Sequence, residues 1–251
     1  DLGVEYHSTV CFDESYAQRD STIRRETAFP KTLEDLVLSG PHFAAGNPLN
    51  KTPRRKCTEN SHYDVLDLQS LPDDYLPRAN YCRATELESF RKRIPRVSWI
   101  EKGQMEPRSV ASYYRLAYRA MLPHSTERTL FGAIIPPGPT HTNGCRVYAA
   151  SPRHLREFIA FGATTFSIVA DYRLRSSGRT NLHSMLDDFP LPTGDDRTLN
   201  ALIVRALVLN CLTVNYRDLW SACWHESFKT EEWTIDDRRL PNTFFASLGP
   251  T

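Results

Sequence analysis

At 251 residues, the chain is long enough to bury a sizeable core and fits a single domain with irregular insertions. Its hydrophobic content of 40% and charged content of 24% are ordinary for a globular protein and exclude wholesale disorder. The formal net charge is only +1. This balance argues against a protein whose whole surface follows nucleic acid, because such domains carry a marked basic excess, although a local basic face is compatible with it.

The sequence also gives no support for a membrane protein, a metal-binding protein or a protein stabilised by disulfides. No window approaches the roughly 20 apolar residues that cross a bilayer, and the N-terminus has no basic and apolar leader, so we expect a cytoplasmic protein without a membrane partner. The six cysteines form no CxxC pair and no zinc-type spacing, and the eight histidines stand alone in the sequence. We therefore predict free thiols, several of them buried, and no metal site.

The first third of the chain predicts short elements separated by prolines. Residues 1–38 form an N-terminal segment, near whose end the run LEDLVLSG predicts a short helix closed by Gly40. The run HFAAG predicts a strand, and the loop 47–56 that follows it holds prolines that forbid regular structure. Residues 63–83 alternate apolar and polar side chains, which favours short strands, and residues 84–93 predict a helix that ends before Pro95.

A more regular helix is predicted from Pro107 to the residue before Pro123. With 3.6 residues per turn, Arg108, Arg115 and Arg119 fall within a narrow stripe, while apolar side chains share another face. The sequence thus predicts a helix with a row of cations along one side.

The second half predicts two strands followed by helices. Strands are expected at 129–136 and 145–150, with Asn143-Gly144 supplying a turn ready for positive φ. Ser151-Pro152 predicts the cap and first turn of an amphipathic helix that runs to about residue 172. A polar, glycine-marked loop comes next, then a buried helix over 197–209 and a tryptophan-bearing segment. These elements predict an α+β fold of mixed small sheets with flanking helices, its main domain at 39–225 and a tail at 226–251.

One motif points toward catalysis. Gly46-Asn47-Pro48-Leu49-Asn50 follows an apolar stretch, as the catalytic loop of amino-methyltransferases does, where asparagine oxygens hold the target amino group. The second proline and the stacking aromatic are absent, and no glycine-rich cofactor segment precedes the motif, so we predict no catalytic residue in this chain. The alternative is a self-contained small enzyme, either a divergent methyltransferase that uses Asn47 or a hydrolase, although no GxSxG elbow is present.

Nucleic-acid contact has more support from the residues. Fixed cations and amide donors bind phosphates, and Arg, Asn and Gln bind base edges. Such groups occur together in four places in the chain, although charge-striped helices are often only solvated faces. The predicted DNA-binding residues in these places are Asn50, Lys51, Arg54, Arg55, Lys56, Arg78, Asn80, Arg115, Arg119, Arg175, Arg179, Asn181 and His183.

Several phrases of the sequence together resemble one family. They are SGPHFAAGNPLNKTPRRKC, LPDDYLPRANYCRA, YRLAYRAM followed by ERTLFGAIIPPG, IVADYRLRSSGRTNLHSMLDDFPLP and LVLNCLT. They are similar to the DNA target-recognition region of adenine-specific restriction-modification methyltransferases, including type IIG enzymes and the methylase of DISARM-like phage-defence systems. The similarity covers most of residues 39–224, and it implies the fold of such a recognition domain.

This resemblance implies sequence-specific recognition of double-stranded DNA in a bacterial defence system. In that family the recognition region acts with a methyltransferase domain, whose cofactor is S-adenosylmethionine. We therefore expect a full-length adenine-specific DNA methyltransferase, with no cofactor in this chain, which the missing catalytic motifs and the start without methionine predict to be a fragment. The matching positions imply that the DNA-facing residues are Arg115, Arg119, Arg128, Arg175, Arg179 and Asn181.

Two alternatives stay open at this point. Arg128 could form a salt bridge with Glu127 or a neighbouring acid instead of contacting DNA. The chain could also be a protein-interaction module of a defence complex that docks through its C-terminal tryptophans, although large aromatics are more often core residues. The tryptophans concerned are Trp220, Trp224 and Trp233.

Overall fold

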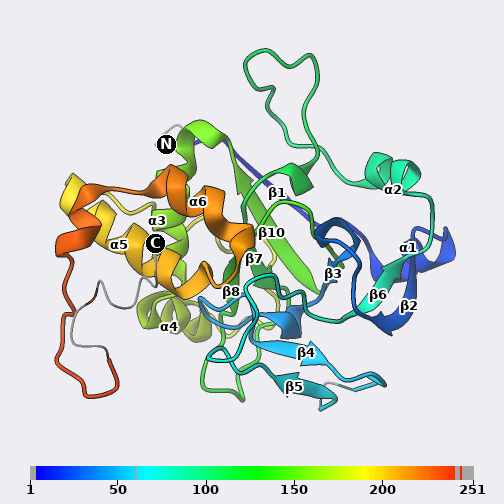
Figure 1. Cartoon of the computed structure of the whole chain (residues 1–251), viewed down its shortest axis with the longest axis horizontal. Helices are drawn as coiled ribbons and strands as arrows, with labels where there is room; N and C mark the ends of the chain where they lie inside the picture. Colours follow the sequence, from blue (N-terminus) through cyan, green and yellow to red (C-terminus); the bar gives the residue numbers. More distant parts are fainter. Residues whose placement is uncertain (1–3, 60, 241–243, 245–251) are drawn as a thin grey trace.

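The centre of the molecule is a four-stranded antiparallel sheet with the strand order β1-β10-β7-β8 (Figure 1). The computed structural model describes residues 4–59, 61–240 and 244. The strands of this sheet are β1 (Tyr6–Thr9), β7 (Arg115–Arg119), β8 (Gly132–Ile135) and β10 (Cys145–Ala150). The strands predicted at 129–136 and 145–150 are therefore confirmed.

Three smaller strand pairs surround this sheet. They are β2 (Ile23–Ala28) with β6 (Ala79–Arg83), β3 (Val37–Leu38) with β9 (Thr140–His141), and β4 (Lys51–Pro53) with β5 (Tyr63–Val65). Residues 4–38 supply β1, β2 and β3, each of which pairs with a strand from the region 39–225. The N-terminal segment thus shares its sheets with the rest of the chain.

Helices flank these sheets (Figure 1). The α-helices are α1 (Glu14–Arg19), α2 (Leu87–Arg93), α3 (Leu155–Thr165), α4 (Ile168–Ser176), α5 (Asp196–Asn210) and α6 (Arg217–Cys223). The 3-10 turns are η1 (Leu33–Asp35), η2 (Gly40–His42), η3 (Val110–Ser112), η4 (Pro152–His154), η5 (Val214–Tyr216) and η6 (Glu226–Thr230). The fold is α+β with small sheets and flanking helices, as predicted.

The central strand β7 separates two environments. Side chains alternate across a strand, so Leu116 and Tyr118 enter the main core beneath the helices, whereas Arg115, Ala117 and Arg119 face the opposite side. The helix predicted over 107–122 is therefore wrong. The arginine spacing fitted a helical period, but this segment pairs with β10 on one side and β8 on the other, and tertiary pairing overrides local periodicity.

The main core lies between the sheet and the helical layer. Helix α3 packs on β8, and α5 packs on α3. A Cβ on Gly132 would collide with the ring of Tyr118, so this glycine permits close packing within the sheet. At the sheet edge, the Asn210 side chain accepts a hydrogen bond from the Ile134 amide at 2.7 Å. The end of α5 thereby satisfies a donor on an edge strand.

Two helical predictions are confirmed, and a third is corrected. Helices α2 and α5 match the predicted 84–93 and 197–209. The helix expected to run to residue 172 ends at Thr165, because the Ser167 side chain accepts a hydrogen bond from the Ala170 amide and caps the new helix α4. The polar, glycine-marked stretch expected from residue 173 starts inside α4, which includes 173–176, and it becomes a loop only from Ser177 onward.

Three predictions in the first 60 residues need correction. The run LEDLVLSG forms η1 and β3, and HFAAG gives part of η2 and an isolated bridge from Ala44 to Asn47 instead of a strand. The basic loop 47–56 contains the strand β4, whose proline at its end leaves the pairing with β5 intact.

The Asn143-Gly144 turn is present, and Gly144 has no positive φ.

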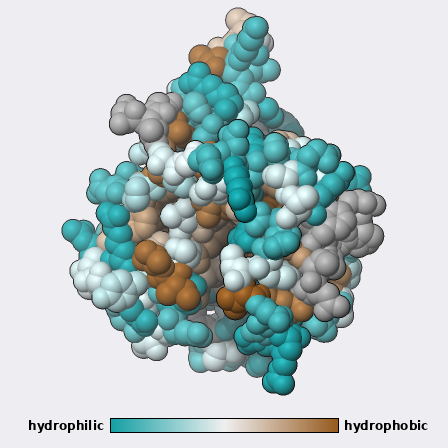
Figure 2. All heavy atoms as spheres, turned by 90° about the vertical axis from the view of Figure 1, so that its left-hand side faces the viewer, coloured by the Kyte–Doolittle hydropathy of each residue, from teal (hydrophilic) through white to brown (hydrophobic). Residues whose placement is uncertain are grey.

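All six cysteines are free thiols, and four of them are buried, as predicted. In the part of the chain that the structure describes, no helix has both the length and the apolar character needed to cross a membrane. Figure 2 views the side that carries α5 and α6, where apolar residues form separate patches among hydrophilic ones.

Candidate nucleic-acid interface

Arg115 lies inside the protein. Its side chain is 0% exposed, and it donates from Nε to the Tyr113 carbonyl at 3.1 Å and from Nη2 to the Pro136 carbonyl at 2.8 Å. Burial lowers the pKa of this guanidinium to about 10. These hydrogen bonds fix the end of the central sheet. Because its side chain has no solvent-exposed surface, Arg115 cannot face DNA in this structure.

Arg119, two residues further along β7, holds η2 against the sheet. It donates from Nε to the Gly40 carbonyl at 2.8 Å and from Nη2 to the Phe43 carbonyl at 2.6 Å. The ring of Phe131 covers its guanidinium at 4.1 Å, and burial lowers its pKa to about 10. Its Nε and Nη2 groups are used within the fold, so we do not place Arg119 at the interface.

The pair Arg78 and Asn80 is also largely structural. Asn80 is 8% exposed, accepts a hydrogen bond from Thr27 at 2.9 Å and donates one to the Tyr63 hydroxyl at 2.7 Å. Arg78 is half-buried, with its guanidinium 4.8 Å from the centre of the Phe29 ring. These contacts join β2, β5 and β6.

Two polar loops from different parts of the chain lie side by side. The Leu122 amide donates to the Thr180 carbonyl at 2.8 Å, and the Leu182 amide donates to the Ala120 carbonyl at 2.9 Å. The His124 ring bonds the Arg179 carbonyl at 2.8 Å. We name the loop 123–128 together with residues 173–183, which are the last turn of α4 and the loop after it, the two-loop platform.

Two predicted DNA-facing arginines hold the two-loop platform in place. Arg175 donates to the carbonyls of His124 at 2.9 Å and Glu127 at 3.3 Å, and also to that of Thr126. Arg128 donates to the carbonyls of Phe166 and Ser167 at 2.9 and 3.1 Å. Their guanidinium groups therefore fix the shape of the loops.

A buried carboxylate, not predicted from the sequence, completes this framework. Asp171 is 4% exposed and accepts hydrogen bonds from the amides of Thr129 at 2.7 Å and Leu130 at 2.6 Å. The same oxygen lies 3.4 Å from Nε of Arg128. Arg128 therefore forms an ion pair, which was the alternative to DNA contact, but its partner is an acid 43 residues away in the sequence and not Glu127. The only sequence signal was an acid inside an amphipathic helix.

Two side chains of the two-loop platform, Arg179 and His183, face solvent. Within the described residues, the exposed side chains of Arg179 and His183 make no hydrogen bond or ion pair, and Asn181 is half-buried beside them. Gly178, with φ of +67°, turns the chain after α4. His183 has φ of +42°, which is uncommon for a residue with a side chain and is often maintained at functional sites.

The β4–β5 hairpin carries a second exposed basic cluster. Arg54 forms an ion pair with Asp64 at 2.8 Å, whereas Arg55 and Lys56 are exposed and have no ion-pair partner among the described residues. Lys51 and Asn50 are half-buried at the base of the hairpin. The hairpin and α4 both lie along the lower edge of the molecule in Figure 1.

The groups considered for catalysis or docking have structural contacts. The Asn47 side chain accepts a hydrogen bond from the Leu49 amide at 2.8 Å, which closes a local turn. Trp220, Trp224 and Trp233 are half-buried against the main core. No group of three or more potential metal ligands occurs within 4–59, 61–240 and 244.

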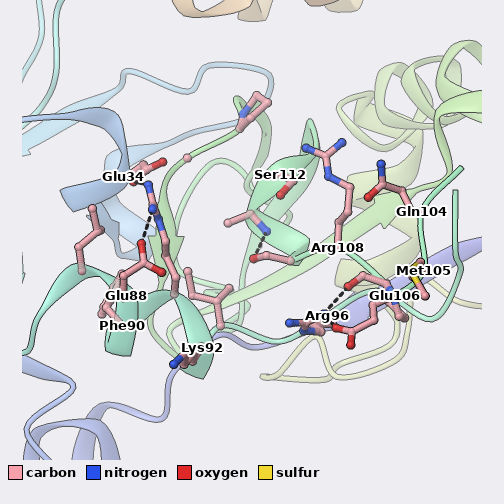
Figure 3. Close-up of a pocket in the computed structure, with 18 of the residues that line it drawn as sticks. Glu34, Glu88, Phe90, Lys92, Arg96, Gln104, Met105, Glu106, Arg108 and Ser112 are labelled. Carbon is pink, nitrogen blue, oxygen red and sulfur yellow. Dashed lines mark hydrogen bonds and ion pairs between the residues drawn. The ribbon is translucent and has the colours of Figure 1, made fainter.

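An open cleft of about 970 Å³ lies between α2 and the segment 103–109 (Figure 3). Most of its charged groups offset one another: Arg91 pairs with Glu34 at 2.8 Å and with Glu88 at 2.7 Å, and Arg96 pairs with Glu106 at 2.7 Å. Among the described residues, Lys92 is the one basic lining residue without an ion-pair partner, and a single exposed lysine does not extend the candidate interface to this cleft.

Comparisons of the chain with protein-family models, with curated proteins and with solved structures found no match.

Proposed function

We propose that this chain recognises double-stranded DNA as the target-recognition part of an adenine-specific DNA methyltransferase in a restriction-modification or phage-defence system. The observation that supports this most is the two-loop platform, in which Arg128 and Arg175 fix the backbone while Arg179 and His183 remain free at the surface. Cations bind phosphates, and arginine and asparagine side chains also bind base edges.

Rigidity is the reason that the internal arginines matter for this function. A loop that becomes ordered only on binding loses conformational entropy, and this loss lowers its affinity. A loop that is loosely held also discriminates less well between bases. Here Arg175 links the end of α4 to the carbonyls of the loop 123–128, and Asp171 links α4 to the segment that leads from this loop into β8. The exposed groups are thus presented on a backbone that is already fixed.

The β4–β5 hairpin is proposed as a second point of contact. Arg55 and Lys56 are exposed and unpaired within the described residues. Long cationic side chains of this kind bind the DNA backbone without reading its sequence. Two separate basic patches also agree with a net charge of only +1, because the excess positive charge is local.

Methyl transfer is assigned in this proposal to a methyltransferase domain in the same polypeptide or in a partner chain. That domain would hold S-adenosylmethionine, for which this chain supplies no glycine-rich segment. Asn47 does not support a self-contained enzyme, because its side chain is bonded to the Leu49 amide. Heat released when this chain alone is mixed with S-adenosylmethionine would favour the self-contained enzyme instead.

We expect the double variant Arg179→Ala/His183→Ala to bind duplex DNA about tenfold more weakly or worse, because it removes two unpaired donors from the two-loop platform. Fluorescence anisotropy with a random-sequence duplex pool at several salt concentrations measures this. The salt dependence of affinity should become less steep in the variant, since fewer phosphate contacts release fewer counterions.

The matched control is Arg217→Ala on α6, because this arginine is also exposed and unpaired within the described residues. Its affinity and thermal stability should equal those of the unmodified chain. If the double variant and the control bind DNA equally well, the two-loop platform is not the DNA-binding surface.

A further inference from the structure

A second cavity, of about 430 Å³, is lined by five aromatic side chains, three aliphatic ones and two aspartates. Tyr6 and Tyr148 come from the paired strands β1 and β10, and Phe158 and Phe161 come from α3. Phe189 closes another side from the segment that follows the two-loop platform. This volume and lining match those of cavities that hold small organic molecules.

The charged groups at this cavity are all acidic. Asp187 and Asp188 line it, both are exposed, and neither forms an ion pair with a described residue. No lysine, arginine or histidine is among the lining residues that the structure describes, and the Arg173 guanidinium lies 4.7 Å from the centre of the ring of Phe189, a wall residue. The two carboxylates give the mouth of the cavity a negative charge.

A buried hydroxyl lines the same cavity without a partner. Tyr148 is 3% exposed, and its hydroxyl makes no hydrogen bond within the described residues. Burial and then the charge of Asp187 raise the pKa of Tyr148 to about 12, so the phenol remains neutral. Ser8 and Asp187 act on this hydroxyl, and Asp187 is itself part of the cavity wall. No hydrogen bond of normal geometry pairs the Tyr148 hydroxyl within the described residues, so its oxygen is open to an N–H donor that enters the cavity.

We propose that this cavity binds an organic ammonium ion, with its apolar body against the aromatic walls and its nitrogen against Asp187 and Asp188. Aromatic faces attract cations, and N–H donors form strong hydrogen bonds to carboxylates. The Tyr148 oxygen can accept a further N–H hydrogen bond. An anionic ligand would be repelled here, and a neutral one would leave the acidic mouth unpaired, so this binding activity is separate from the proposed recognition of DNA.

The test is calorimetric titration of the intact chain with 2-phenylethylammonium, 2-phenylethanol and 3-phenylpropionate. The ammonium ion is expected to bind saturably and the anion not at all. The double variant Asp187→Asn/Asp188→Asn should bind the ammonium ion about tenfold more weakly or worse, because charge-assisted hydrogen bonds are lost. The control Asp73→Asn/Asp74→Asn changes another exposed aspartate pair and should bind normally.

A second variant tests the buried hydroxyl. Because its oxygen has no partner in the fold, Tyr148→Phe should keep its thermal stability while binding the ammonium ion severalfold more weakly. The proposal is overturned if the chain does not bind 2-phenylethylammonium or binds 2-phenylethanol equally well. It is also overturned if the Asp187→Asn/Asp188→Asn variant keeps full affinity.

Discussion

Replacement of Asp171 by alanine is expected to lower the free energy of unfolding by about 3 to 5 kcal/mol. Asp171 is 4% exposed, and one of its oxygens accepts hydrogen bonds from the amides of Thr129 and Leu130. The variant would leave both amides buried without an acceptor. It would also leave the guanidinium of Arg128, 3.4 Å away, without its counter-charge.

Urea denaturation of Asp171→Ala and Asp171→Asn separates these effects. Asparagine keeps an oxygen that can accept from the two amides but loses the charge, so its loss of stability should be clearly smaller than that of alanine. Asp188→Ala, at an exposed position, should change stability by less than about 1 kcal/mol. A similarly small effect for Asp171→Ala would contradict the role given to this carboxylate.

Acidification from pH 7 to pH 4 is expected to destabilise the fold through a buried histidine, by on the order of 3 kcal/mol. His141 lies on β9 and is 0% exposed. Burial, followed by the positive charge of Arg115, lowers its pKa from 6.5 to about 3. The folded protein therefore holds this ring neutral over a range of pH in which the unfolded chain protonates it.

The sign follows from this depressed pKa. Below pH 6.5 the unfolded state binds a proton at this histidine, whereas the folded state excludes that proton until about pH 3. The contribution of His141 to the free energy of unfolding is therefore fully present above pH 6.5 and is lost as the pH falls from 6.5 toward 3. His42 adds to the same trend, because burial also lowers its pKa. Its ring is 2.8 Å from the Arg78 carbonyl and 2.9 Å from the Ser39 carbonyl.

Unfolding free energies at pH 7 and pH 4 for the unmodified chain, His141→Leu and His183→Leu test this expectation. Carboxylates contribute to acid destabilisation in all three proteins, so the difference between them isolates the histidine. His141→Leu should lose much less stability on acidification than the unmodified chain. The exposed His183→Leu control should behave like the unmodified chain, and an unchanged acid response in His141→Leu would show that the histidine is not responsible.

Elements with strong local signals could be predicted from the sequence. Helix α5 has nearly continuous apolar character, and strands β8 and β10 are apolar runs bounded by turn residues. The polar loop after α4 could also be predicted, because Gly178 and its polar neighbours favour a turn. These features depend on residues close together in the chain, which is what a sequence pattern reports.

The arginines could not be assigned from the sequence, because their roles depend on distant carbonyl groups. Arg119 binds the carbonyls of Gly40 and Phe43, and Arg175 binds that of His124. Arginine is rarely fully buried without an acidic partner, so a sequence pattern predicts that every arginine is exposed. Nothing in the local pattern therefore distinguished the buried Arg115 from the exposed Arg179. The spacing of arginines on β7 also fits a helix, and only the pairing with β8 and β10 decides between the two structures.

Amide hydrogen exchange with and without duplex DNA tests most directly whether the two-loop platform binds DNA. Protection should increase at residues 123–128 and 173–183, with a smaller increase at the β4–β5 hairpin, because bound DNA would restrict opening of these exposed backbones. Helix α6 should exchange at an unchanged rate. Protection confined to α6 and η6, or no change anywhere at saturating DNA, would contradict the proposed interface.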